Sequence, residues 1–212
     1  MKRFHKMLLS AAVGGTLLFS AQAAKPQDIL QATLPAVQQE WQSTGTISTT
    51  SLSGEDYSMQ LGLLVPKKQL YMVTLSTTDA TGASFHKCGV FNPQTGKLIV
   101  PLEYDSVQAL SNGELLLYQW DSAAPLCWFA DAAGALTQIE LPTGYTDLSP
   151  DSSGLFILSQ MVQKPMKDVN MPETTEGNVT QFAIADRNMN IIRDNIDGGA
   201  SGSSICPPEY IN

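Results

Sequence analysis

A tight-turn pattern that occurs three times constrains this chain more than any other feature of its sequence. FNPQTG at 91–96 matches FADAAG at 129–134, 38 residues later, and IADRNM at 184–189 is a degenerate third copy. In each copy an apolar residue ends an expected strand. In the first two copies the sixth position is glycine, which adopts a left-handed backbone at little cost. In the third copy we expect Asn188 to be the left-handed residue. The pattern predicts a repeated β-hairpin module.

From Thr44 onward the chain is rich in β-branched and aromatic residues, with Gly, Pro, Asn and Asp at short intervals. Such a pattern is typical of short strands, and four strands in about 38 residues is the spacing of repeated four-stranded sheets. A two-sheet sandwich gives similar spacing and is the alternative. The predicted strands are 58–65, 69–75, 88–92, 97–101, 106–109, 114–120, 126–130, 136–141, 154–160, 180–185 and 190–193. Residues 76–84 and 163–178 lack periodic apolar positions and are predicted loops.

An amphipathic stripe precedes this β region, between residues 27 and 42. It consists of Leu30, Leu34, Val37 and Trp41, at steps of four, three and four. Pro35 interrupts the stripe, because a proline inside a helix loses one hydrogen bond and clashes with the preceding turn. We therefore expect a short helix that is kinked at Pro35 or begins near Thr33. The predicted fold class is all-β, with mainly antiparallel hairpin repeats in propeller-like or stacked four-stranded units and one short N-terminal helix.

Residues 89–105, GVFNPQTGKLIVPLEYD, resemble the WG-repeat motif, which reads W-G-aromatic-I-D-x-x-G-K-hydrophobic-I-P-x-x-Y-D. The matching positions are Gly89, Phe91, Gly96, Lys97, Ile99, Pro101, Tyr104 and Asp105. Cys88 stands where the family has its tryptophan. The resemblance is partial and degenerate over about residues 88–160. It implies a β-rich repeat structure with an interaction role and no shared active site.

The first 23 residues have the three parts of a secretory signal. These are the cations Lys2, Arg3 and Lys6, the apolar run 7–19, and the cleavage pattern Ala21-Gln22-Ala23. The apolar run is shorter than the roughly 20 residues that cross a bilayer, so we predict cleavage and no integral membrane segment afterwards. The expected location is the periplasm or the medium. The predicted organisation is a signal peptide at 1–23, a helical segment at 24–43, a β-repeat domain at 44–197 and a flexible tail at 198–212.

The predicted mature chain is strongly acidic. Without residues 1–23 it has nine Lys and Arg against twenty Asp and Glu, a net charge of −11. This charge repels phosphate backbones and no basic cluster reverses it, so nucleic acid is not an expected partner. We expect another protein or a cell-envelope component, with basic partners favoured.

Three cysteines, Cys88, Cys127 and Cys206, remain after the predicted signal. Their spacings fit no zinc pattern and no C-x-x-C motif, so in an oxidising compartment one disulfide is expected. Cys88 with Cys127 is the predicted pair, and Cys206 is the alternative partner. His86 lies two residues from Cys88 and would share its strand face, but no nucleophile motif surrounds either residue. We therefore assign no catalytic residue.

The segment 186–197 carries oxygen-bearing residues at calcium-loop spacing. They are Asp186, Asn188, Asn190, Asp194 and Asp197. Ile191 stands where the calcium loop needs glycine, and a turn rich in Asn and Asp explains the same residues. We assign no metal and no cofactor, and calcium is the alternative.

Three aromatic residues, Trp120, Trp128 and Phe129, are the candidate binding surface, although aromatic residues on strands more often serve as core or rim. The sequence predicts a secreted, non-catalytic β-repeat protein that binds a macromolecule. The alternatives are an inhibitor or immunity-type protein and a small secreted hydrolase.

Overall fold

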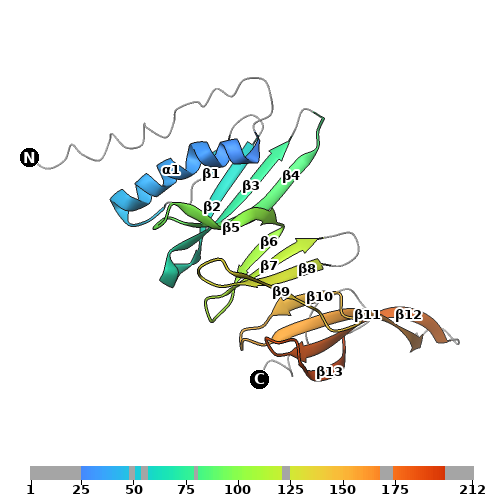
Figure 1. Ribbon diagram of the computed structural model, residues 1–212. Coiled ribbons are helices and arrows are strands. Elements are labelled where there is room, and N and C mark those ends of the chain that lie inside the picture. The colour runs from blue at the N-terminus through green and yellow to red at the C-terminus, as the bar shows by residue number, and fades with distance from the viewer. Residues whose placement is uncertain are drawn as a thin grey trace, which may run out of the picture. The chain divides into compact units, whose positions relative to one another are not determined.

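The computed structural model describes residues 25–47, 51–53, 57–78, 81–120, 125–167 and 174–198. The predicted signal peptide, Cys206 and the tail beyond residue 198 lie outside these residues. The fold is mostly antiparallel β structure with one helix, as the sequence predicted (Figure 1). The chain divides into two compact units at Val107/Gln108, inside the predicted β-repeat domain.

The first unit is built on a five-stranded antiparallel sheet whose strands lie in sequence order. Its strands are β1 (Ser51–Ser53), β2 (Tyr57–Val65), β3 (Leu70–Thr78), β4 (Ser84–Asn92) and β5 (Lys97–Tyr104). The helix α1 (Pro26–Thr44) belongs to the same unit and packs on one face of this sheet.

Helix α1 spans the whole predicted stripe and runs through Pro35, so it does not begin near Thr33. Pro26 occupies the first turn, where its missing N–H costs nothing, and Gly45 ends the helix with a φ of 76°. A proline in a helix interior costs about 3 kcal/mol. Burying each large apolar side chain of the helix contributes about 1.5–3 kcal/mol, so the buried face outweighs the proline. The prediction of a start near Thr33 was wrong for this reason.

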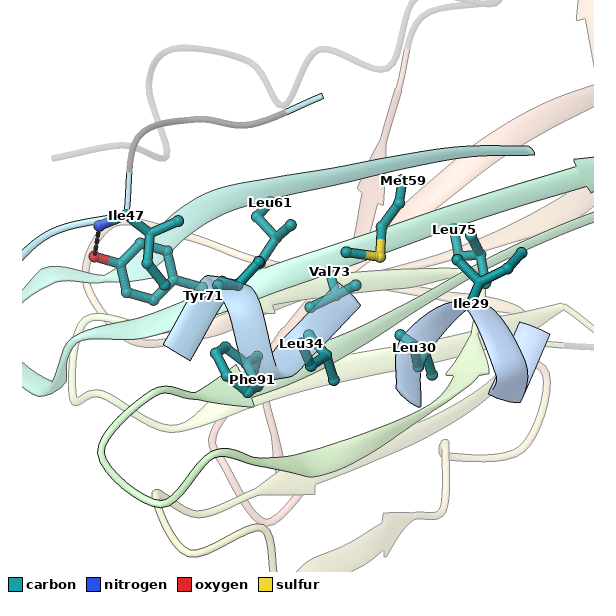
Figure 2. Packing of buried hydrophobic residues seen from close by; sticks show 11 residues of the cluster. Ile29, Leu30, Leu34, Ile47, Met59, Leu61, Tyr71, Val73, Leu75 and Phe91 are labelled. Atoms are coloured by element: carbon teal, nitrogen blue, oxygen red, sulfur yellow. Dashed lines mark hydrogen bonds between the residues drawn. The ribbon is translucent and has the colours of Figure 1, made fainter. Parts of the chain in front are cut away.

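The core of the first unit lies between α1 and the sheet (Figure 2). The helix contributes Ile29, Leu30, Leu34 and Val37, and the strands contribute Met59, Leu61, Tyr71, Val73, Leu75 and Phe91. The phenol oxygen of Tyr71 accepts the backbone N–H of Ile47 at 3.3 Å, which fixes the chain just after the helix. Gln38 donates to the backbone oxygen of Pro93 at 3.2 Å, so α1 also holds the β4–β5 turn.

The second unit consists of two four-stranded antiparallel sheets. One sheet contains β6 (Ser106–Ala109), β7 (Leu115–Trp120), β8 (Pro125–Ala130) and β9 (Leu136–Ile139), where β6 crosses the unit boundary. The other contains β10 (Asp147–Pro150), β11 (Phe156–Lys167), β12 (Thr174–Ala185) and β13 (Ile191–Asp197). Their inner faces share one core, in which the rings of Phe129 and Phe156 lie 5.4 Å apart. The Tyr118 side chain reaches across this core, and its hydroxyl donates to the backbone oxygen of Leu148 at 2.7 Å.

The three repeated turns occupy the same place in the three sheets: they join β4 to β5, β8 to β9, and β12 to β13. Each is the last hairpin of its sheet. The left-handed residues are Gly96, Gly134 and Met189, at φ values of 68°, 88° and 61°. The prediction that Asn188 is the left-handed residue was wrong. Its N–H donates to Asp186 Oδ1 at 2.8 Å, and the left-handed conformation falls on the next residue, Met189.

The predicted strands all appear, several of them longer than predicted, and two strands were not predicted: β1 and β10. The predicted loop 163–178 was wrong, because β11 continues to Lys167 and β12 begins at Thr174. A two-stranded ribbon that extends beyond its sheet buries few side chains on either face. Its sequence therefore lacks the alternation of apolar residues from which a strand is predicted. Residues 76–78 likewise belong to β3, and β4 begins at Ser84.

Candidate binding surface

Trp120 is an exposed aromatic residue that its neighbours hold in place. It ends β7, and its side chain is 58% exposed. Its ring stacks on Tyr118 with 6.0 Å between centroids and 12° between planes. Burial raises the pKa of Tyr118, whose hydroxyl is held by Leu148, so the support under Trp120 is a fixed neutral phenol. A preoriented aromatic side chain loses little entropy when a partner covers it.

The other two predicted surface residues do not join Trp120. Phe129 is 3% exposed and belongs to the core of the second unit, so its assignment to a surface was wrong. Trp128 is half-buried and pairs with Leu117, whereas Trp120 pairs with Pro125. Because side chains alternate between the faces of a strand, Trp128 and Trp120 lie on opposite faces. The three aromatic residues therefore do not line one groove.

An ion pair that the sequence did not reveal connects the two sheets of the second unit. Arg187, in the β12–β13 turn, donates to both carboxylate oxygens of Glu114 at 2.8 and 2.6 Å. Its guanidinium also lies 4.3 Å from the centroid of the Phe129 ring. The hydrogen bonds to Glu114 raise the pKa of Arg187. Arg187 and Glu114 lie 73 positions apart, and no local pattern could have paired them.

Exposed apolar side chains are concentrated in the second unit. Of the seven large apolar side chains that are exposed among the described residues, only Leu63 belongs to the first unit. The six in the second unit are Trp120, Leu126, Leu136, Met161, Ile191 and Ile192. Single exposed apolar residues are ordinary, but this bias toward one unit distinguishes the two surfaces.

Negative charge is concentrated in the same unit. Residues 108–212 contain four Lys and Arg against thirteen Asp and Glu, a net charge of −9, whereas residues 25–107 contain five against seven, a net charge of −2. Three aspartates lie in hairpin turns, where Oδ1 accepts two backbone N–H groups of the turn. They are Asp131, Asp151 and Asp186. The hydrogen bonds from Asn190 lower the pKa of Asp186.

In the described residues Cys88 and Cys127 are not joined to each other, and both are buried. The alternative partner, Cys206, lies outside the described residues. Cys88 shares a hydrogen bond with Thr74 Oγ1 at 3.6 Å and donates to the backbone oxygen of Asp105 at 3.7 Å. Cys127 lies in the core of the second unit. Each thiol is thus enclosed by its own unit.

The histidine and cysteine of β4 have separate partners. His86 is exposed, and its Nδ1 lies 2.8 Å from Ser76 Oγ. Cys88 shares a hydrogen bond with Thr74 instead, two residue pairs further along the β3–β4 ladder. Burial raises the pKa of Cys127 to about 11, so this thiol is not ionised near neutral pH. The geometry assembles no nucleophile with a base at these positions.

The oxygen-bearing residues of the calcium alternative lie on the β12–β13 hairpin. Asp186 uses both carboxylate oxygens within its own turn, with Asn188 and Asn190 as donors. Asp194 accepts the hydroxyl of Tyr145 at 2.5 Å. The side chain of Asp197 lies outside the described part of the structure. Across the described ranges, no three His, Cys, Asp or Glu side chains are arranged to hold a metal ion.

No protein-family model matches this chain, and no curated protein matches it. Among solved structures, the acylaminoacyl peptidase of Pyrococcus horikoshii aligns with 58% of this chain at 11% identity and a TM-score of 0.40. The chain covers 22% of that peptidase, and a likeness at this level supports no inference about function. In the described residues, no helix has the length and apolar character needed to span a bilayer.

Proposed function

We propose that this protein is a non-catalytic binding module that acts outside the cytoplasm and contacts a basic protein or cell-envelope component through its second unit. The observation that carries the proposal is the coincidence of net charge −9 and six exposed apolar side chains in that unit. The signal-like N-terminus supports the location. The resemblance to WG repeats supports an interaction role.

The two properties have separate tasks in binding. The negative field raises the rate at which a basic partner arrives, and this contribution weakens as salt increases. Apolar and aromatic anchors then supply most of the free energy of the contact, and tryptophan is enriched among such anchors. Trp120 is the best-placed anchor, because Tyr118 already holds its ring.

Affinity capture from a cell-envelope extract with the mature chain tests the proposal. We expect a basic protein or polymer to be retained at low salt and released as salt rises. Trp120→Ala should weaken retention about tenfold, the loss expected when a hot-spot side chain is truncated. Leu63→Ala, a matched exposed apolar truncation in the first unit, should leave retention unchanged.

Two outcomes would contradict the proposal. Equal losses for Trp120→Ala and Leu63→Ala would show that the second unit is not the contact surface. Turnover in a broad hydrolase screen that His86→Ala or Cys88→Ser abolishes would show an enzyme instead. If the captured partner is itself an enzyme, its activity with and without the mature chain distinguishes an inhibitor from a scaffold.

A further inference from the structure

Strands β11 and β12 extend beyond their sheet as a two-stranded arm. They form twelve residue pairs, from Phe156 with Ala185 to Lys167 with Thr174. β10 pairs only with Phe156–Ser159, and β13 pairs only with positions between Gln181 and Ala185. From the pair Met161–Thr180 onward, no described strand flanks the ribbon, whose ends pass β10 and β13 in Figure 1. A free ribbon of two strands is marginally stable in water, and its edges are templates for further pairing.

The edge of β12 presents a regular set of backbone groups. In an antiparallel strand, the N–H and C=O of one residue point to the same side, and the side alternates along the strand. The backbone oxygen of Thr180 accepts the N–H of Gly198 at 2.9 Å, so Thr180 faces away from β11. Asn178, Glu176 and Thr174 follow at steps of two, and their backbone groups face the same way.

The edge of β11 is interrupted. The backbone oxygen of Ser159 accepts the N–H of Thr146 at 2.9 Å, so Ser159, Gln163 and Pro165 face outward on that side. Pro165 has no N–H to donate. A strand laid along this edge would therefore miss a hydrogen bond in the middle of the arm.

The other sheet edges have features that prevent a further strand from pairing with them. β5 contains Pro101, and β13 contains two register shifts and the left-handed residue Asn195. β1, β6, β9 and β10 have four residues or fewer. The β12 edge from Thr174 to Asn178 contains no proline, no lysine and no bulge.

We propose that this edge, Thr174–Asn178 of β12, accepts an extended, proline-free basic segment of the partner as an additional strand. The inference rests on the proposed function, because it names the element of the second unit that holds the partner. Backbone hydrogen bonds to Thr174, Glu176 and Asn178 provide the contact, as in other cases of strand addition. The net charge of −9 in the second unit favours a basic strand, and it opposes a second copy of this acidic chain.

A lysine-flanked strand peptide, KTVTVTK, and the mature chain test the proposal by fluorescence anisotropy. Asn178→Pro removes an outward N–H from β12. Gln163→Pro makes the same change on β11 directly opposite, because Gln163 and Asn178 are cross-strand partners and both are exposed. We expect Asn178→Pro to weaken binding about tenfold and Gln163→Pro to change it less than about twofold. The glutamate-flanked peptide ETVTVTE should bind more weakly than KTVTVTK.

Four outcomes would overturn the proposal. Equal effects of the two proline variants, at matched melting temperatures, would show that the β12 edge is not the site. Absence of peptide binding together with slow hydrogen exchange at Asn178 and Glu176 would show that the chain covers this edge itself. Concentration-dependent dimers that Asn178→Pro dissociates would show that the occupant is a second copy. Capture of an envelope partner that Asn178→Pro leaves unchanged would refute this inference while the proposed function stands.

Discussion

The two units solve the problem of covering an apolar sheet face in different ways. In the first unit, α1 covers one face of the five-stranded sheet, and Leu63 is the one large apolar side chain exposed among the described residues. In the second unit, two sheets cover each other, and six such side chains stay exposed among many carboxylates. The comparison teaches that a sheet face covered by a helix and a sheet face covered by a second sheet can leave different amounts of apolar surface exposed within one chain.

The largest expected effect tests whether the two cores are independent. Phe91 is fully buried beneath α1, and Phe91→Ala should cost about 3–5 kcal/mol of unfolding free energy in the first unit. We expect hydrogen exchange to accelerate from α1 to β5 and to stay slow in β7, β8 and β11. Leu158→Ala in the second core is the matched control and should give the reverse pattern. Acceleration of both units by either variant would break the comparison.

The turn residues give a smaller effect that compares the units directly. Asp131→Ala removes an acceptor of two backbone N–H groups and should cost about 1 kcal/mol, measured by urea unfolding. Asp131→Asn keeps Oδ1 and should cost little, because Asn92 already accepts the N–H of Gln94 in the corresponding turn of the first unit. Equal costs for the alanine and asparagine variants would contradict this role.

The ion pair between Arg187 and Glu114 should contribute modestly to the stability of the second unit. A double-mutant cycle of Arg187→Met and Glu114→Gln should give a coupling of about 0.5–1 kcal/mol, because the Arg187 side chain is well exposed. The coupling should fall as salt increases. A coupling that salt does not change would indicate that the contact with the Phe129 ring, and not the charge pair, holds Arg187 in place.

The smallest expected effect is on the stability of the second unit at acidic pH. The hydroxyl of Tyr145, followed by the N–H of Asn195, lowers the pKa of Asp194 below its usual value. A depressed carboxyl pKa contributes stability that is present above about pH 4 and is lost as pH falls through the lowered value. We expect Tyr145→Phe to flatten the acid side of the second unit's stability profile, followed by the fluorescence of Trp120 and Trp128. Trp41 should report no change in the first unit, and a shift there would contradict this prediction.

The turns could be read from the sequence because their chemistry is local. A glycine or an Asx residue within five positions sets each reversal, so the hairpins at 91–96, 129–134 and 184–189 were predicted correctly. Met189 was missed because the contact that accompanies its strained backbone, packing on the second core, involves distant residues. The strands within 163–178 were not predicted, because an edge strand that buries few side chains needs no alternation of apolar and polar residues. Of the predicted site only Trp120 proved exposed, since no local signal tells which face of a strand meets a second sheet.

The two enclosed thiols have a consequence for how this chain matures. Cys88 and Cys127 are buried in separate units, and in the described residues they are not bonded to each other. Neither unit waits for a covalent link between them, so the two should reach their native packing at the same rate under reducing and oxidising conditions. After packing is complete, oxidants and thiol reagents can reach these two sulfurs only when a unit opens, and the rate of their modification then measures that opening.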